Sequence, residues 1–375
     1  MLESLEIRNF RCLKNLKIPS LKRINLFTGK NNTGKSTILE AIALYTTKGH
    51  LSLISQLLTE RGENVRQYEK NHHHIENNLK VFSSLFTDRN CGFDPMDAIS
   101  IGEVKNETSE EDSPSHKSIT LNFVKYVDVR EKEDQGFVLR RKRFSVQNNE
   151  KRIEEGYKLG FELGIGNDSV IFPLNFHIFS EYYPRLDAMN VQYVRGRNID
   201  NENNSRLFDN ITLTNKEQHV IDALKIIEPA TEKIAFVEED TRGRRAVIKL
   251  SNSQNVLPLK SMGDGINRIL TMILALVNSE NGFLLIDEFE NGLHYTIQEQ
   301  LWKIIFLMSR KLNIQVFATT HSEDSIRGFE SVLNSSDYSP LGKLVRLDNK
   351  NGTIVPVEYD AKELEITNRN DIEIR

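Results

Sequence analysis

The stretch Gly29–Thr37, which reads GKNNTGKST, constrains this chain more than any other part of its 375 residues. It matches the phosphate-loop pattern G-x-x-x-x-G-K-[ST] at every fixed position. An apolar run over 24–27 indicates a buried strand before the loop, and apolar residues over 38–44 indicate a helix after it. A glycine turn before an ordinary core helix is the alternative, but strand, loop, Lys-Ser pair and helix all agree. The pattern therefore predicts a site for a phosphate chain.

The residue types within the loop suit this chemistry. Glycines let the backbone curl until amide N–H groups point at the anion, and the following helix adds the positive end of its dipole. Lys35 supplies a point charge for the β- and γ-phosphates, and Ser36 supplies a hydroxyl ligand for Mg²⁺. We expect the nucleotide contacts to come from Asn31, Asn32, Thr33, Gly34, Lys35, Ser36 and Thr37.

A second segment supplies carboxylates. The continuous apolar run 283–286 predicts a strand in the middle of a parallel sheet, and Asp287 and Glu288 follow it directly. Open α/β sheets bind ligands at this end of their strands. We expect Asp287 to hold Mg²⁺, directly or through water, and Glu288 to act as general base or orienting group for the attacking water.

A third segment also places polar residues directly after a predicted strand. The next predicted strand, 314–319, is followed by Thr320, His321 and Ser322. A histidine can donate a hydrogen bond to a phosphate oxygen, so His321 is a candidate γ-phosphate sensor. The helix predicted over 295–310 connects the two strands and is expected to bury Trp302.

Composition limits the other function classes. The formal net charge is −4, so no global basic field draws the protein onto nucleic acid. Two cysteines, Cys12 and Cys91, give no disulfide framework and no Cys-rich metal site, which suits a reducing cytosol. The acidic start over 1–6 is unlike a signal peptide, and apolar runs such as 269–277 are too short to span a bilayer. We expect a cytoplasmic protein without a membrane partner.

Local features leave some alternatives open. The run His72–His74 invites a metal interpretation, but adjacent residues point in different directions, so a solvated surface is favoured. Basic clusters at 140–143 and 242–245 keep direct DNA contact open. For the first cluster, a charged sheet edge is the favoured alternative. The second lies in a hairpin predicted from strands over 234–238 and 246–250.

Taken together, the motifs resemble the ABC-type ATPase heads of the SMC, RecF and OLD families, and most closely the stand-alone AAA-type ATPases of bacterial defence systems. The segment 5–11 resembles the first strand of those heads, 28–37 the Walker A motif and 283–288 the Walker B motif. Segment 290–294 occupies the place of the D-loop, and 318–322 resembles the switch-histidine strand.

Two further motifs match more weakly. The residues in the place of the signature motif are Ser261, Met262, Gly263, Asp264 and Gly265. They depart from the common Leu-Ser-Gly-Gly-Gln form but keep a serine and small positions before a helix. Gln192 is the candidate for the Q-loop glutamine.

The resemblance implies an α/β fold of the P-loop NTPase type, ABC- and SMC-head-like, with a β-rich lobe and an inserted helical and β arm. Residues 1–48 and 190–335 would form the head, 50–190 a variable insertion, and 336–375 a hairpin and helix that close the head. Such heads sandwich ATP and Mg²⁺ between two copies. Ser261, Gly263, Asp264 and Gly265 of one copy would then reach the γ-phosphate bound by the other, in a homodimer or higher homo-oligomer.

Two departures shape the functional hypothesis. No long heptad repeat separates the halves, so this is not a long-armed SMC protein. The TOPRIM nuclease of OLD proteins has no counterpart, because only about fifty residues follow His321 and they lack an Asp-x-Asp pair.

The first hypothesis is an ATP-hydrolysing switch whose nucleotide-dependent dimerisation controls a separate nuclease, TOPRIM-like or toxin effector in anti-phage defence. The alternative is a DNA-binding repair ATPase of RecF or SMC type. A transporter ATPase subunit is disfavoured by the altered signature motif and the large insertion.

Overall fold

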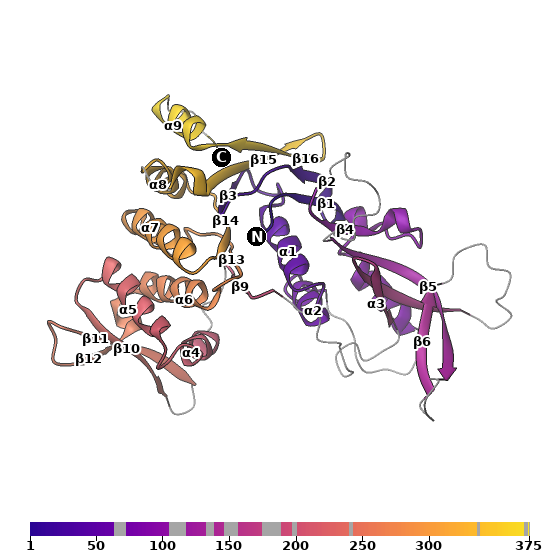
Figure 1. Cartoon of the computed structure of the whole chain (residues 1–375), viewed down its shortest axis with the longest axis horizontal. Coiled ribbons are helices and arrows are strands. Elements are labelled where there is room, and N and C mark those ends of the chain that lie inside the picture. The colour runs from indigo at the N-terminus through magenta and orange to yellow at the C-terminus, as the bar shows by residue number, and fades with distance from the viewer. Residues whose placement is uncertain are drawn as a thin grey trace.

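The computed structural model describes residues 1–63, 73–104, 118–132, 139–145, 157–174, 189–196, 201–239, 243–335, 338–370 and 374 (Figure 1). Two larger sheets and a small one, with the helices packed on them, make up this part of the chain. None of the helices described combines the length and apolar character needed to cross a bilayer.

A six-stranded sheet forms the centre of the molecule, and all its neighbouring strands are parallel except for the hairpin at one edge. In spatial order its strands are β16 (Thr353–Tyr359), β15 (Gly342–Lys350), β3 (Ile24–Thr28), β14 (Gln315–Thr319), β13 (Phe283–Ile286) and β9 (Val191–Val194). The β15–β16 turn has positive φ at Asn351 and Gly352, which is the geometry of a tight hairpin turn. The predicted C-terminal hairpin is confirmed, and β15 also pairs with β3 as a strand of the central sheet.

Both faces of the central sheet are buried, which explains its continuous apolar strands. In β13, Phe283 and Leu285 belong to one hydrophobic core, whereas Leu284 and Ile286 belong to the core on the other face. Side chains alternate between faces along a strand, so a strand covered on both sides can be apolar at every position, as β13 is. The α/β expectation for the head is confirmed.

The helix that follows the phosphate loop, α1 (Lys35–Thr46), packs on one face of this sheet and is enclosed by a second sheet, seen at the right in Figure 1. That second sheet is antiparallel and seven-stranded, with the order β2-β1-β4-β5-β7-β8 and β6 beside β5. Its strands are β1 (Leu5–Phe10), β2 (Leu13–Ile18), β4 (Ile99–Gly102), β5 (Ser118–Lys132), β6 (Leu139–Ser145), β7 (Lys158–Ile165) and β8 (Asp168–Pro173). Nearby lie α2 (Leu51–Thr59), α3 (His73–Ser83) and the 3₁₀ turns η1 (Thr87–Arg89) and η2 (Pro95–Asp97).

This second sheet combines two parts of the predicted domain division. Glu6, Ile7 and Arg8 of β1 pair with Gly102, Ile101 and Ser100 of β4, respectively. The strands within 50–190 therefore extend a sheet that the N-terminal segment begins. The division into head and insertion stays a prediction.

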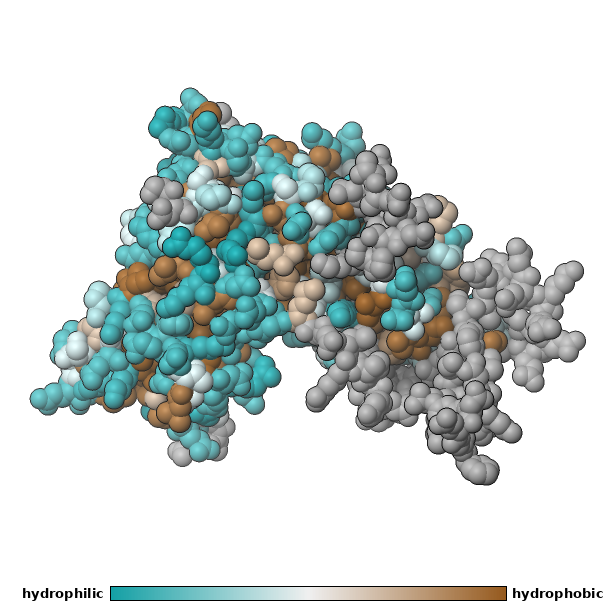
Figure 2. Space-filling model, viewed as in Figure 1, coloured by the Kyte–Doolittle hydropathy of each residue, from teal (hydrophilic) through white to brown (hydrophobic). Residues whose placement is uncertain are grey.

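Helices and a small sheet cover the other face of the central sheet. They are α4 (Asn201–Asp209), α5 (Asn215–Ile227), α6 (Asp264–Asn278), α7 (Tyr295–Lys311), α8 (Glu323–Leu333) and α9 (Ala361–Arg369), with β10 (Thr231–Glu238), β11 (Arg244–Leu250) and β12 (Val256–Pro258). The 3₁₀ turns η3 (Leu259–Met262) and η4 (Ser339–Leu341) complete this side. The hairpin predicted over 234–250 and the helix predicted over 295–310 are confirmed. Figure 2 shows that hydrophilic side chains dominate the outer surface on this side, with smaller apolar patches between them.

Trp302 of α7 is fully buried, as predicted. Its ring stacks on Phe289 with 4.0 Å between centroids, and its Nε1–H donates to the carbonyl of Ser325 at 3.2 Å. The indole therefore joins α7 and α8 to the segment that follows β13.

The structure describes the two basic clusters and the histidine run only in part. Arg244 forms an ion pair with Asp209, and Arg245 forms one with Glu239 at 3.1 Å, whereas residues 240–242 lie outside the described residues. The cluster 140–143 lies in β6, whose side chains are not described. His72 also lies outside the described residues, and His73 and His74 begin α3 without described side chains.

A buried ion network joins the β1–β2 turn to α1 and α2. The Arg11 guanidinium donates to Glu40 at 2.6 Å and to the carbonyl of Leu57 at 3.2 Å, while Arg61 donates to the same Glu40 at 3.0 Å. Burial lowers the pKa of Arg11, and the neighbouring Glu40 opposes this shift. Removing one partner would leave a buried charge poorly compensated.

We predict that Arg11→Met lowers the free energy of unfolding by about 3 kcal/mol, because it leaves the buried carboxylate of Glu40 with Arg61 alone. Thermal and urea unfolding followed by circular dichroism measure the loss. The matched control is Arg369→Met, which removes an exposed pair with Glu365 on α9 and should change stability far less. Equal losses in the two variants would contradict a structural role for the network.

Candidate active site

The phosphate loop has a backbone that only particular residues adopt easily. Gly29, Asn32 and Gly34 all have positive φ, at 136°, 61° and 86°. A Cβ at Gly29 would lie 2.5 Å from the backbone oxygen of Leu347, so β15 presses directly on the loop. Thr33 stabilises the curl by donating to the carbonyl of Lys30 at 2.8 Å. Among the described residues no side chain caps the first turn of α1, so its N–H groups suit an anion.

Lys35 is buried at the base of this loop. Its Nζ donates to the carbonyls of Gly29 at 2.6 Å and Lys30 at 2.8 Å. Burial lowers the pKa of Lys35 to about 8, although the carboxylates of Asp287, Glu290 and Glu288 act in the opposite direction. The ammonium group is therefore poorly solvated, and a phosphate placed on the loop would stabilise its charged form.

Ser36 and Asp287 meet across the sheet, although 251 positions separate them in the sequence. The Ser36 hydroxyl donates to Oδ1 of Asp287 at 3.0 Å, and the Thr319 hydroxyl donates to the same oxygen at 2.6 Å. Neighbouring ligands of an octahedral Mg²⁺ lie about 2.9 Å apart, so the Ser36 and Asp287 oxygens fit such an ion. Thr319 was not singled out from the sequence, although it is the last residue of a predicted strand.

Glu288 is held in a strained backbone conformation. Its φ is 50°, which is unusual for a non-glycine residue, and its N–H donates to the Thr319 hydroxyl at 2.9 Å. A Cβ at Gly196 would lie 2.3 Å from Oε2 of Glu288, so only glycine leaves room for this carboxylate. The contact with Thr319 and the space left by Gly196 accommodate this conformation, and the side chain lines the same cleft as Ser36 and Asp287.

Arg268 of α6 is a site residue that the sequence did not reveal. It is 4% exposed, and its guanidinium donates to the backbone oxygens of Asp287 at 3.0 Å and Arg195. Burial lowers its pKa, and Glu288, Asp287 and Glu290 oppose that shift. The only sequence signal was a charge on an otherwise apolar stripe. Arg268 also lies 3.4 Å from the carbonyl oxygen of Glu288, so it connects α6 to the backbone of both Asp287 and Glu288.

Glu290 organises the loop that carries His321. Its carboxylate accepts from the backbone N–H of His321 at 2.8 Å and from the Thr320 hydroxyl at 2.7 Å. Burial and the nearby Lys35 lower the pKa of His321, so its imidazole is neutral at neutral pH and has one N–H to donate. The sequence placed Glu290 in the D-loop but did not reveal this contact.

The predicted signature residues lie at the surface. Ser261 lies within η3, is exposed and donates to the carbonyl of Pro258 at 2.7 Å. Gly263 is also exposed, with a φ of 103°, and α6 begins at Asp264, whose side chain is not described. A Cβ at Gly265 would lie 3.0 Å from the oxygen of Gly292, so this segment adjoins the predicted D-loop. Their role toward a second copy stays a prediction.

The remaining predicted nucleotide-binding residues differ in exposure and position. Asn31 and Asn32 are exposed within the loop, and Thr37 is buried with its hydroxyl 3.6 Å from the sulfur of Cys12. Gln192 lies in β9 opposite Leu284 and lines a neighbouring cavity, whereas Tyr193 and Arg195 line the cleft with Ser36, Asp287 and Glu288. A role for Gln192 stays a prediction.

We predict that affinity for ATP weakens above pH 8. Below pH 7 Lys35 is already protonated, so the dissociation constant is flat; as pH rises through about 8 the free protein loses this charge. ATP binding then requires Lys35 to take up a proton, so the dissociation constant increases by up to about tenfold for each pH unit above 8. Titration with ATP from pH 7 to 9.5 measures this. Lys30→Ala, which keeps the carbonyl that Lys35 contacts, should show the same slope. A constant Kd over this range would contradict the assignment.

Comparison with known proteins gives the family. The family model described as "AAA ATPase domain" matches residues 1–326. An ATP/GTP phosphatase of Helicobacter pylori is 24% identical over 398 residues, covering 99% of this chain and 99% of that protein. An uncharacterised protein of Methanocaldococcus jannaschii is 46% identical over 61 residues, covering 16% of this chain and 28% of that protein.

A solved structure has the same fold. The SMC head bound to the C-winged helix domain of ScpA has a TM-score of 0.51 and 14% identity, covering 97% of this chain and 99% of that one. The predicted P-loop NTPase fold of SMC-head type is thereby confirmed, and so is the prediction of an ATPase. Because the family match extends over residues 1–326, this chain belongs to the AAA ATPase domain family.

Proposed function

We propose that this ATPase is a switch: two copies close around ATP and Mg²⁺, and the closed state controls a separate nuclease, TOPRIM-like or toxin effector in anti-phage defence. The observation that carries the proposal is the convergence of Ser36, Asp287 and Thr319 beside Glu288. It supports a nucleotide site assembled from the ends of three adjacent strands, at the edge where open α/β sheets bind ligands.

In this proposal each residue has a defined task. Lys35 and the N–H groups at the start of α1 bind the phosphates, and Ser36 and Asp287 hold Mg²⁺, which when bound would neutralise charge on the phosphate oxygens. Glu288 orients the attacking water and accepts its proton, and its backbone contacts keep it there. His321, placed by Glu290, donates a hydrogen bond toward the γ-phosphate.

The surface position of the signature residues supports action on a second copy. Ser261 and Gly263 are exposed, and Gly263 has no described atom within 4 Å of where a Cβ would lie. A backbone open in this way suits close approach to a ligand held by another molecule. Arg268 on α6, the helix that follows these residues, contacts the backbone of Asp287. Binding of a second copy at the signature residues would therefore be coupled to the carboxylates of the same chain.

The DNA-repair alternative receives less support. Arg244 and Arg245 are paired with Asp209 and Glu239, so they are already partly neutralised within the chain. Duplex binding at low salt, which falls steeply as salt is added, would favour this alternative.

We predict that Glu288→Gln binds ATP but hydrolyses it at least about 100-fold more slowly, because the amide cannot accept the proton of water. Lys35→Ala should lose both binding and turnover. Phosphate release and ATP titration measure the two effects. Glu299→Gln on α7, which removes an exposed carboxylate paired with Lys303, is the matched control and should keep normal turnover. Unchanged hydrolysis in both Lys35→Ala and Glu288→Gln would exclude the assigned site.

We predict that Glu288→Gln accumulates a dimer with ATP, and that adding Ser261→Arg abolishes this dimer. The bulky charged side chain would block approach of the second copy while leaving the binding loop intact. Light scattering after gel filtration gives the mass. A dimer that survives Ser261→Arg would contradict closure through this surface.

The defence role has a separate test. Cells that carry the gene with its flanking reading frames should survive phage challenge, and the Lys35→Ala version should not. Equal survival with both versions would remove the defence role without affecting the ATPase assignment.

A further inference from the structure

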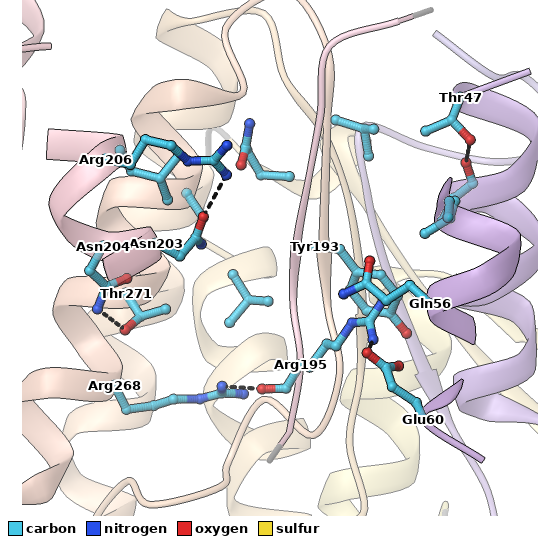
Figure 3. Close-up of a pocket in the computed structure, with 17 residues that line it drawn as sticks. Thr47, Gln56, Glu60, Tyr193, Arg195, Asn203, Asn204, Arg206, Arg268 and Thr271 are labelled. Carbon is cyan, nitrogen blue, oxygen red and sulfur yellow. Dashed lines mark hydrogen bonds and ion pairs between the residues drawn. The ribbon is translucent and has the colours of Figure 1, made fainter. Parts of the chain in front are cut away.

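Arg195 lies immediately after β9, at the same end of the central sheet as Asp287 and Glu288. It lines the cleft of about 590 Å³ that those carboxylates and Ser36 also line. Figure 3 shows its side chain beside Tyr193 and Glu60, on the wall shared with the neighbouring cavity of about 600 Å³. No motif in the sequence singles out this arginine.

The side chain of Arg195 contacts Glu60 and Tyr193, and the nearby carboxylates of Glu40 and Asp287 oppose the lowering of its pKa by burial. The side chain forms an ion pair with Glu60, the C-cap residue directly after α2, and its guanidinium lies 4.8 Å from the centre of the Tyr193 ring. The Arg195 side chain is 21% exposed, whereas that of Glu60 is 42% exposed. A half-exposed carboxylate is a weak partner because solvent screens it, so a more highly charged anion in the cleft would compete well.

The other cation of the cleft is already engaged. Arg61 donates to Glu40 at 3.0 Å, and Glu40 is also paired with the buried Arg11. Of the two arginines that line the cleft in the described part of the chain, Arg195 is therefore the one whose partner is replaceable. A guanidinium matches the geometry of phosphate oxygens and can bind two of them at once.

The backbone of Arg195 is fixed independently of its side chain. Its carbonyl accepts a hydrogen bond from Arg268, which also contacts the carbonyl of Asp287 at 3.0 Å. Substitution of the side chain therefore leaves this link intact. The backbone position of Arg195 is thus held by Arg268 and does not depend on the ion pair with Glu60.

We propose that Arg195 binds a phosphate group of the nucleotide, and that Glu60 holds this arginine until the nucleotide enters. The inference rests on the proposed ATP site and adds a phosphate-binding residue to it. Glu60 acts only through Arg195, as a competitor for its charge. The residue that follows α2 thereby lowers the affinity of the site for a nucleoside triphosphate.

The test compares Arg195→Met, Arg195→Lys and Glu60→Gln. We expect Arg195→Met to lower kcat/KM for ATP by about 10- to 100-fold, mainly through KM, and Arg195→Lys to recover part of the loss because it keeps the charge. Methionine preserves contact with Tyr193, and the midpoint of unfolding checks that each variant is folded. Arg206→Met on α4 lines the neighbouring cavity but not the cleft, and it should keep the wild-type KM.

Glu60→Gln is the decisive variant. It should lower KM about two- to tenfold in the wild-type background and have no effect in the Arg195→Met background. A folded Arg195→Met with kcat/KM within twofold of wild type would overturn the inference, as would a Glu60→Gln effect that persists without Arg195. In either case, loss of turnover in Lys35→Ala would leave the proposed function standing.

Discussion

The contact on which the site depends is the meeting of Ser36, Thr319 and Asp287 at a single carboxylate oxygen. It joins the ends of three segments: the first turn of α1, β14 and the residue after β13. The sheet order brings these ends together, since β3, β14 and β13 are neighbours and run in the same direction. Glu288 is linked to the same junction through its hydrogen bond to Thr319.

Charge is distributed around the junction in a consistent way. Three carboxylates, from Asp287, Glu288 and Glu290, act on a single buried lysine, and burial still lowers the pKa of that lysine. The nearby Arg268 donates to backbone carbonyls of the carboxylate segment. Carboxylates therefore outnumber the buried ammonium group around the junction, an arrangement that suits the magnesium–nucleotide complex of the proposed function.

The sequence predicts the local parts of this arrangement well. The loop, the carboxylate strand and the histidine strand each carry their own pattern, and the central α/β sheet follows from buried strands such as 283–286. It does not predict partners that depend on the tertiary fold. The Glu290 contact to the His321 loop spans 31 positions, and the Arg268 contact to Arg195 spans 73. The pairing of β1 with β4 and the addition of β15 to the central sheet join strands that are far apart in the sequence, so no local pattern predicts them.

The position of Trp302 has a practical consequence. It is the single tryptophan of the chain, and its indole stacks on Phe289, the residue directly after Glu288. Indole emission depends on its immediate surroundings, so any rearrangement of the carboxylate segment should alter the intrinsic fluorescence of the unlabelled protein. The fold thus contains a native optical reporter one residue away from the proposed site of hydrolysis.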